Sequence, residues 1–546
     1  MRIALVQFDA SVGDIKGNTA KIQRLCGKAF ELGADVVVFP EMAVCGYPPE
    51  DLLLKKQFLN DNRLAVEQLA GCSFETTIVV GFAETDGEQC FNSAAVLKKG
   101  EIKKIYRKTL LPNYGVFDEQ RYFKPGNEPV VVEIKGIKVI LTICEDIWQL
   151  EWLDELLKDY SNNDIILNIS ASPFHTGKIK QRQLILKRCA KHFNCAIAYC
   201  NLVGGQDELV FDGRSMFVDS SGRVLCQAKA FEEDLLLANI SIDPSKKVRV
   251  EAVNPSDSSP STPWDVEAEV YNALLLGTRD YIRKNGFSKV IVGLSGGIDS
   301  SLTAAIAVDA LGAGNVVGVT MPSKFNSSET IGDAKKLADN LGIEFHTIPI
   351  GAVLDTFDKS LGDVRGWTKD GTAFENLQAR IRGCILMSLS NQFSNMVLTT
   401  GNKSETAVGY STLYGDTAGG FAVLKDVPKT MVYELAEYVN KKHQLEVIPV
   451  SVMERQPTAE LKENQKDTDT LPEYDVLDEI LKGYIEQEKS LSQIMNEGTP
   501  ENVAKQVISM VDRNEYKRRQ SPPGIKITPK AFGRDRRMPV TNHYTS

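Results

Sequence analysis

The sequence predicts an α/β protein in two parts, a mixed sheet covered by helices followed by an open parallel sheet. Three observations lead to this prediction. Short runs rich in Val and Ile, typical of buried strands, recur along the whole chain. Segments with helical periodicity separate these runs. The stretch Val253–Pro263 contains three Pro and five Ser or Thr without periodicity, which indicates a linker between two domains.

In the first half, the expected strands lie in RIALVQF, ADVVVFPE, TTIVVGFAE, KVILTICEDIW, DIILNIS and CAIAYCNLV. Turns at Lys99-Gly100 and Ser221-Gly222 predict two hairpins, which add antiparallel pairing. Helical patterns lie near Asn18–Leu32, Gln57–Ala70 and Gln181–His192. Strands and helices of this kind predict a mixed sheet with helices on its surface.

In the second half, strands and helices alternate strictly. The expected strands lie in SKVIVGLSGG, NVVGVTMP, IEFHTIPI and NMVLTTGN, with helices near Asp299–Leu311, Glu329–Leu341 and Phe374–Ser390. This alternation is typical of an open parallel sheet with helices on both faces.

The composition excludes several classes of protein. The 546 residues carry a net charge of −9, which argues against a nucleic-acid binder. No apolar run approaches the ~18–20 residues that cross a bilayer, and the N-terminus reads as a strand, so we expect a cytoplasmic protein. The ten cysteines form no zinc spacing and should be reduced. Arg513–Arg537 contains nine Lys or Arg and is either a solvated tail or a local phosphate site.

The segment SGGIDSS, Ser295–Ser301, follows a buried strand and opens a helix. Its glycines allow close approach of a ligand, and the helix start presents free amides, so the segment is a candidate anion site. It lacks the Lys of a Walker A loop. Tight packing is the alternative explanation. The segment resembles the pyrophosphate loop of enzymes that split ATP into AMP and pyrophosphate while adenylating a carbonyl oxygen.

Five further motifs resemble those of NAD synthetases: ENLQARIR, GNKSETAVGYSTLYGD, LKDVPKTMVYELA, RQPTAEL and YKRRQSPPG. The resemblance implies ATP contacts at Gly293, Ser295, Gly296, Gly297, Asp299, Ser300 and Thr400, and deamido-NAD contacts at Asn376, Arg380, Glu405 and Lys517. It implies Mg²⁺ at Asp299 and Glu405, while Lys429 and Thr458 match less closely. Ammonia-dependent members carry a Lys where this chain has Leu413. Glu405 as a helix cap and Lys517 as a solvated residue remain alternatives.

Three strands of the first half end in residues suited to acyl chemistry, namely Glu41, Lys108 and Cys144. Taken alone, each is more readily explained as a structural residue than as a catalytic one. Strand ends can meet at one edge of a sheet, and there a thiolate nucleophile would gain a base and a cation. The cation would stabilise the oxyanion of a tetrahedral intermediate.

The sequence around these residues resembles the carbon–nitrogen hydrolase (nitrilase) superfamily with its Glu-Lys-Cys triad. LPNYGVFDEQRYF is similar to the glutaminase domain of glutamine-dependent NAD synthetases. The resemblance implies that Glu41 is the general base, Lys108 the oxyanion stabiliser and Cys144 the nucleophile. It also implies glutamine contacts at Tyr114, Ser172 and Lys178, although an exposed lysine is the alternative for Lys178.

Together the resemblances imply a glutaminase domain at 1–250 with a nitrilase-like αββα sandwich, a linker at 251–267, and a synthetase domain at 268–546 with a Rossmann-like ATP pyrophosphatase fold. The implied reaction amidates deamido-NAD with ammonia from glutamine, consumes ATP and needs Mg²⁺, and the enzyme is expected to be a homo-oligomer. One alternative is an ammonia-fed synthetase with a nitrilase-like module that no longer hydrolyses. Two further alternatives are GMP synthetase and a dinucleotide sensor without catalysis.

Overall fold

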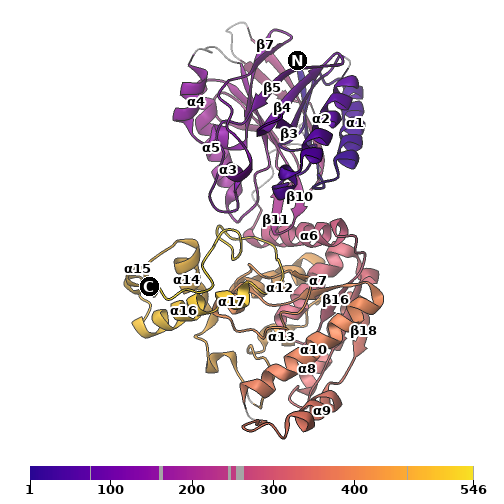
Figure 1. Cartoon of the computed structure of the whole chain (residues 1–546), viewed down its shortest axis with the longest axis vertical. Coiled ribbons are helices and arrows are strands. Elements are labelled where there is room, and N and C mark those ends of the chain that lie inside the picture. The colour runs from indigo at the N-terminus through magenta and orange to yellow at the C-terminus, as the bar shows by residue number, and fades with distance from the viewer. Residues whose placement is uncertain are drawn as a thin grey trace. The chain divides into compact units, whose positions relative to one another are not determined.

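The computed structural model describes residues 1–73, 75–158, 164–243, 248–253, 264–369, 371–463 and 465–544. The chain divides into two compact units, Met1–Trp264 and Asp265–Ser546 (Figure 1). Most of the predicted linker, residues 254–263, lies outside the described residues.

In the described part of unit 1, the strands form two large sheets and a small hairpin. The first sheet has the order β15 (Val248–Ala252), β14 (Asp234–Ile242), β1 (Arg2–Gln7), β2 (Val36–Val38), β3 (Thr77–Thr85), β4 (Cys90–Lys98) and β5 (Glu101–Arg107). The second has the order β13 (Val224–Gln227), β12 (Met216–Val218), β9 (Ala196–Asn201), β8 (Ile165–Ser170), β7 (Ile137–Ile143) and β6 (Val131–Ile134). The hairpin pairs β10 (Val203–Gln206) with β11 (Leu209–Asp212).

Alternation of side chains along each strand explains how the two sheets pack. Ile3 and Leu5 of β1 belong to one buried cluster together with Leu141 of β7 and Leu167 of β8. Their neighbour Ala4 faces the opposite way, into a different cluster. Because successive side chains of a strand point to opposite faces, the first cluster lies between the sheets. Each sheet therefore has one face against the other sheet and one face for helices.

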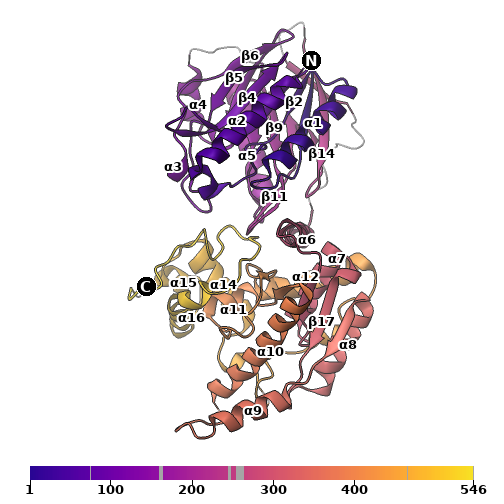
Figure 2. The same cartoon turned by 45° about the vertical axis from the view of Figure 1, so that its right-hand side comes forward.

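Helices cover both outer faces, so unit 1 is the αββα sandwich that the resemblance implied. On the first sheet lie α1 (Ile15–Glu31) and α2 (Lys56–Gly71), side by side in Figure 2. On the second lie α4 (Leu150–Leu157) and α5 (Lys178–Phe193). The short elements are η1 (Glu50–Leu54), α3 (Glu119–Tyr122) and η2 (Cys144–Ile147).

In unit 2 the described residues form one parallel sheet of five strands. The order is β18 (Glu344–Thr347), β17 (Val316–Thr320), β16 (Val290–Gly293), β19 (Met396–Thr399) and β20 (Phe421–Ala422). The chain starts in the middle, builds outward to β18, and then returns to the other side of β16. Ligands of open α/β sheets bind where the strand order reverses, outside the carboxyl ends of the strands. Here that point is the end of β16.

Helices flank this sheet as the alternation predicted. Ile291, Val317 and Val397 pack against Phe374 and Ile381 of α10 (Thr372–Phe393), with α9 (Gly351–Leu361) beside it. The other large helices are α6 (Val266–Lys284), α7 (Ile298–Leu311), α8 (Ser328–Leu341) and α12 (Lys429–His443). The C-terminal part adds α11 (Lys403–Val408), α13 (Val450–Glu454), α14 (Tyr474–Leu481), the π-helix η5 (Lys482–Glu486), α15 (Leu491–Asn496), α16 (Glu501–Arg513) and α17 (Glu515–Arg518), with short turns η3 (Ala313–Asn315) and η4 (Asp467–Asp469).

The expected strands and helices, and both expected hairpins, are present. The strand pattern did not reveal that unit 1 holds two sheets rather than one. It also missed several strands of unit 1, namely β6, β10, β11, β14 and β15. In β15, Arg249 and Glu251 alternate with apolar residues at the edge of a sheet. The strands were predicted from continuous apolar runs, and an edge strand exposed to water carries no such run.

Candidate active sites

The first site forms where three strands of unit 1 end. Glu41 lies just beyond β2, Lys108 directly follows β5, and Cys144 directly follows β7. The Lys108 Nζ donates to Glu41 Oε1 at 2.7 Å, and both side chains are fully buried. Burial and the nearby charge of Glu41 hold the pKa of the Cys144 thiol well above its ordinary value, while Lys108 acts in the opposite direction. The structure thus brings the three predicted residues together, with the thiol neutral at rest.

Two amide groups orient the Glu41 carboxylate. Asn92 of β4 donates its side-chain N–H to Oε1 at 2.7 Å, and the backbone N–H of Ala171 donates to Oε2 at 2.8 Å. A buried carboxylate is tolerated only when its oxygens are hydrogen-bonded or paired with a cation. Glu41 has both, so its carboxylate is fixed in position near the Cys144 thiol.

Glu119 belongs to the same cluster, although the sequence did not single it out. Its Oε1 accepts from Lys108 Nζ at 2.8 Å and from the Tyr47 hydroxyl at 3.0 Å. Burial raises the pKa of Glu119 to about 7, against the opposing effect of Lys108. Lys108 therefore lies between two carboxylates. The only sequence signal for Glu119 was its place in the motif that follows Lys108, and the motif does not say which acidic residue turns inward.

The three predicted glutamine contacts differ in their surroundings. The Tyr114 hydroxyl donates to the Glu145 carboxylate at 2.9 Å, and the rest of the side chain is exposed. Lys178 Nζ lies 4.2 Å above the Trp148 ring, and burial lowers the pKa of Lys178 to about 8. Ser172 is buried, and its backbone N–H donates to Asn201 Oδ1 at 3.0 Å. Burial raises the pKa of Glu145, the residue after Cys144, while Tyr114, through its hydrogen bond, and Lys178, through its charge, both act to lower it. Ser172 is instead buried in the interior of unit 1.

The second site surrounds the loop between β16 and α7. Gly296 has φ +81°, and a Cβ there would lie 2.1 Å from the Thr330 carbonyl oxygen, so only glycine fits. The Ser295 and Ser300 hydroxyls lie 3.2 Å apart across the loop. A cavity of about 300 Å³ opens beside it. All seven predicted ATP contacts line this cavity: Gly293, Ser295, Gly296, Gly297, Asp299, Ser300 and Thr400.

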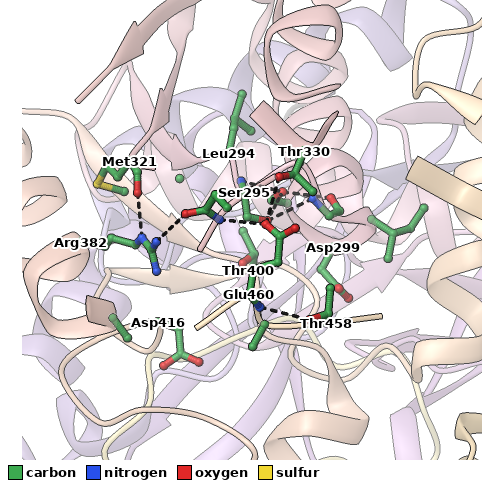
Figure 3. A pocket seen from close by; sticks show the side chains of 18 of the residues that line it. Leu294, Ser295, Asp299, Met321, Thr330, Arg382, Thr400, Asp416, Thr458 and Glu460 are labelled. Atoms are coloured by element: carbon green, nitrogen blue, oxygen red, sulfur yellow. Dashed lines mark hydrogen bonds between the residues drawn. The ribbon is translucent and has the colours of Figure 1, made fainter. Parts of the chain in front are cut away.

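Two carboxylates that line this cavity, Asp299 and Glu405, lie against the same lysine; Figure 3 shows Asp299 near Thr400. Asp299 accepts from the Asn402 amide at 2.9 Å and forms an ion pair with Lys429. Glu405 lies 3.9 Å from the same lysine. Burial and the charge of Asp299 raise the pKa of Glu405 to about 8. Glu405 also helps cap α11, because its side-chain Oε2 accepts from the Asn402 backbone N–H at 3.4 Å, while Asn402 Oδ1 accepts from the Glu405 backbone N–H at 2.9 Å. The capping and cavity-facing roles therefore coexist.

A polar network that the sequence did not reveal lines the opposite side. Arg382 donates to the Met321 carbonyl at 2.9 Å and to Asn326 Oδ1 at 3.1 Å. Asn326 in turn donates to Glu460, which also accepts from Thr330. Figure 3 shows Arg382 beside Met321. The partners are distant in sequence, so no local motif could have predicted them.

Three predicted deamido-NAD contacts lie outside the main cavity. Arg380 is exposed, donates to the Leu413 carbonyl at 3.2 Å, and lines a separate hollow of about 510 Å³. Lys517 donates to the Gly409 and Ser411 carbonyls and shares a small pocket with Glu405. Asn376 accepts from the Thr412 hydroxyl at 2.7 Å. Of the four, only Glu405 lines the main cavity. Thr458 lines it as well, as does Lys429.

Known proteins match both units. Residues 2–249 match the carbon-nitrogen hydrolase family and residues 270–521 match the NAD synthase family. A glutamine-dependent NAD(+) synthetase from Thermotoga maritima is 47% identical over 570 residues, covering 100% of this chain and 99% of that protein. This chain belongs to the glutamine-dependent NAD(+) synthetases.

Other glutamine-dependent NAD(+) synthetases agree. The one from Aquifex aeolicus is 46% identical, with 100% of both chains covered. Among solved structures, the enzyme from Acinetobacter baumannii, in complex with adenosine diphosphate, is 43% identical with a TM-score of 0.79, covering 99% of this chain and 98% of that one. The enzyme from Cytophaga hutchinsonii, at 22% identity and a TM-score of 0.84, shows the shared fold. The predicted family and fold are confirmed, and the GMP synthetase alternative is excluded.

The basic C-terminal stretch of this NAD(+) synthetase is built into its fold. Arg518 is buried and donates to the Ala407 and Val511 carbonyls. Lys526 and Arg536 are also buried, with Asp535 and Asp512 as partners. A solvated tail is therefore the wrong interpretation for these three residues. Residues 486–506, which carry no motif, contribute Glu486, which accepts from the buried Lys403 at 2.7 Å, and Ile494 of a buried cluster.

Within the described ranges, no group of three or more His, Cys, Asp or Glu is placed to hold a metal ion. Asp299 and Glu405 nevertheless fit a Mg²⁺ site that phosphates and water complete, because Mg²⁺ commonly takes only one or two protein carboxylates. Lys429 already balances part of their charge.

No described helix is long and apolar enough to cross a membrane.

Proposed function

We propose that this chain makes NAD from deamido-NAD, ATP and glutamine, with hydrolysis of glutamine in unit 1 and amidation in unit 2. The observation that carries this proposal is the buried Glu41–Lys108 pair beside Cys144 in a chain that also holds the glycine loop and Asp299. A nitrilase-like module without hydrolysis would have no need of this costly buried charge cluster.

In unit 1, Glu41 takes the proton of the Cys144 thiol as the sulfur attacks the side-chain amide carbon of glutamine. Lys108 donates to the oxygen that becomes negative in the tetrahedral intermediate. The intermediate collapses, the amide nitrogen takes the proton from Glu41, and ammonia leaves. Glu41 then accepts a proton from water, which attacks the γ-glutamyl thioester. Glutamate is released and the thiol is restored.

Tyr114, Ser172 and Lys178 are the proposed glutamine contacts. Lys178 suits the α-carboxylate, since its ammonium group is held by a ring face and not consumed by a direct ion pair in the described structure. Tyr114 and Glu145 present a hydroxyl and a carboxylate next to the nucleophile. This arrangement favours a zwitterionic amino acid over a simple amide.

In unit 2, the loop from Gly293 to Ser300 binds the ATP phosphates through backbone N–H groups and two hydroxyls. The nicotinate carboxylate attacks the α-phosphorus, and diphosphate leaves. Ammonia then attacks the resulting acyl adenylate, AMP leaves, and the amide forms. Asp299 and Glu405 would hold Mg²⁺, which would neutralise charge on the phosphates. Asn376, Arg380, Glu405 and Lys517 are the proposed deamido-NAD contacts.

The remaining assignments rest on family membership. Residues 1–250 are the glutaminase domain and residues 268–546 the synthetase domain, joined by 251–267. The enzyme is cytoplasmic and forms a homodimer or larger homo-oligomer. Size-exclusion chromatography with light scattering checks the oligomer.

The test compares nitrogen sources. Native protein and the Cys144→Ala variant receive deamido-NAD, ATP and Mg²⁺ with either glutamine or an ammonium salt, and NAD and AMP are measured. Native protein should use both sources, and the variant should keep ammonium while losing glutamine by about 10³-fold or more, the loss typical of a missing nucleophile. Cys72→Ala, an exposed cysteine, is the control and should behave as native. Glutamine use by Cys144→Ala at the native rate contradicts the glutaminase assignment, and absence of NAD from ammonium contradicts the synthetase assignment.

A further inference from the structure

Asp146, two residues after Cys144, has an unusual number of hydrogen bonds for one carboxylate. The side chain is fully buried. Its Oδ1 accepts from the Thr109 backbone N–H at 3.1 Å, the Thr109 hydroxyl at 2.8 Å and the Leu110 backbone N–H at 2.9 Å. Its Oδ2 accepts from the Tyr106 hydroxyl at 2.8 Å and the Ile143 backbone N–H at 2.9 Å. Five donors satisfy the oxygens of a charge that would otherwise be costly to bury.

The five donors come from two places that matter for glutamine hydrolysis. Tyr106, Thr109 and Leu110 lie on either side of Lys108, at the end of β5. Ile143 is the last residue of β7 and directly precedes Cys144. One carboxylate therefore contacts the segments that carry the cation and the nucleophile.

These two segments belong to different sheets. β5 is at an edge of the first sheet, and β7 lies in the second. Strand pairing sets distances within a sheet, but it does not set the distance between residues of two facing sheets. That distance depends on side-chain packing and on polar links such as Asp146.

The turn at Cys144 also needs support. Cys144 has φ +45°, in the left-handed region that a residue with a Cβ rarely adopts. Such a conformation persists when its surroundings over-determine it. The bond from the Ile143 N–H to Asp146 closes this turn, and Asp146 itself is anchored to the segment around Lys108.

We propose that Asp146 is a positioning residue that holds the Cys144 turn in register with Lys108. The proposal rests on the proposed glutaminase function of unit 1. Asp146 acts through the backbone on either side of the reacting groups and does not touch glutamine.

The Asp146→Asn variant tests this because it changes one oxygen into a donor and leaves the size unchanged. With the amide oxygen at the Oδ1 position, the new N–H₂ group faces the Ile143 N–H, and two donors oppose each other beside Cys144. With the amide reversed, the N–H₂ group faces the two backbone donors after Lys108. Either orientation disturbs one of the two segments.

We expect Asp146→Asn to lower kcat for glutamine hydrolysis by about 10²-fold, the effect of a displacement of about 1 Å between reacting groups. KM for glutamine should change by less than about threefold, because Tyr114 and Lys178 do not contact Asp146. NAD synthesis from ammonium should stay at the native rate, because it needs only unit 2, and the calorimetric transition of unit 1 should persist, which reports that unit 1 is folded. Alkylation of Cys144 by iodoacetamide, followed by mass spectrometry of its peptide, should slow in parallel with kcat.

Asp164→Asn is the matched control. Asp164 also accepts from a backbone N–H of β7, that of Lys138 at 2.7 Å. Lys138 lies at the start of β7, the end of the strand away from Cys144. This variant should hydrolyse glutamine as the native protein does. If Asp146→Asn fails to fold, Thr109→Val removes the hydroxyl that donates to Asp146 on the Lys108 side and accepts from the partly exposed Trp152 indole N–H, and it should still lower kcat severalfold.

The outcomes separate the two proposals. A native kcat in folded Asp146→Asn, or in Thr109→Val where that variant replaces it, overturns the positioning role. An equal loss in Asp164→Asn overturns it too, since the effect would then be general. If Cys144→Ala loses glutamine use and Asp146→Asn keeps the native kcat, only the positioning role is wrong. If Cys144→Ala still uses glutamine, the glutaminase function of unit 1 is wrong.

Discussion

At the scale of single residues, burial controls the chemistry of the first site. Lys108 is fully buried between Glu41 and Glu119, and its pKa stays well above the ordinary value because these carboxylates outweigh desolvation. Lys178 has no such pair, and desolvation lowers its pKa to about 8. Two lysines of one site therefore differ in function: Lys108 is a permanent cation, and Lys178 titrates near neutral pH.

The titration of Lys178 leads to a prediction on pH. The lysine is charged below its pKa of about 8 and neutral above it, so the proposed ion pair with the glutamine α-carboxylate would be lost as pH rises. KM for glutamine should increase about 5–10-fold between about pH 7 and pH 9, with a smaller change in kcat. Glutamate release under initial-rate conditions measures both constants.

Lys178→Arg separates this effect from titration of glutamine itself. The guanidinium remains charged throughout this range, while the α-amino group of the substrate titrates equally in both enzymes. The ratio of the two KM values should therefore change with pH. A constant ratio would mean that Lys178 does not bind the α-carboxylate.

At the scale of elements, both sites lie at the carboxyl ends of strands. β2, β5 and β7 carry the three residues of the first site, and β16 leads into the loop of the second. The loop depends on backbone conformation, because Gly296 adopts φ +81° with the Thr330 carbonyl directly beside it. The close approach of α8 to this loop thus leaves no space for a side chain.

Replacement of Gly296 by Ala should therefore damage the nucleotide site. The added Cβ would force apart the loop and the start of α8, where Ser327 caps the helix. We expect a loss of about 10²-fold or more in kcat/KM for ATP during NAD synthesis from ammonium, since the phosphate-binding amides would be misplaced.

Gly332→Ala, one turn into α8, is the control for this variant. No atom lies within 4 Å of a Cβ at Gly332, and Ala favours a helix over Gly by up to about 1 kcal/mol. Its activity should match the native protein, and its melting temperature should not fall. Equal activity in Gly296→Ala and Gly332→Ala would show that the loop tolerates the displacement.

At the scale of the whole molecule, each unit has its own hydrophobic core. The clusters of unit 1 lie between its sheets and beneath its outer helices, and the clusters of unit 2 lie against its sheet and among its C-terminal helices. Domains with separate cores generally fold as units.

Residues 265–546 expressed alone should therefore fold and make NAD from ammonium but not from glutamine. In the full chain, ATP with Mg²⁺ should raise the melting temperature of one calorimetric transition and leave the other unchanged, because a ligand stabilises only the unit that binds it. A single transition that moves as a whole, together with an insoluble fragment, would argue that the two units depend on each other for stability.

Much of this architecture was predictable from local sequence. The strands, the principal helices, the glycine loop and the triad Glu41, Lys108 and Cys144 all follow from apolar periodicity or short motifs, which depend on neighbours along the chain. Glu119, Asp146 and the network around Arg382 did not emerge in this way. Each acts through partners far apart in sequence or on another sheet.

Local sequence therefore predicted the elements through strand periodicity, and it predicted the family and the candidate site residues through motifs that resemble known ones, because both signals are written in adjacent residues. Only the tertiary structure decided which strands of unit 1 belong to which sheet, that Lys108 lies between two carboxylates, and that Arg380 and Lys517 lie outside the main cavity. Those properties depend on which faces pack together and which charges are buried together. Packing and desolvation act between segments that only the folded chain brings into contact.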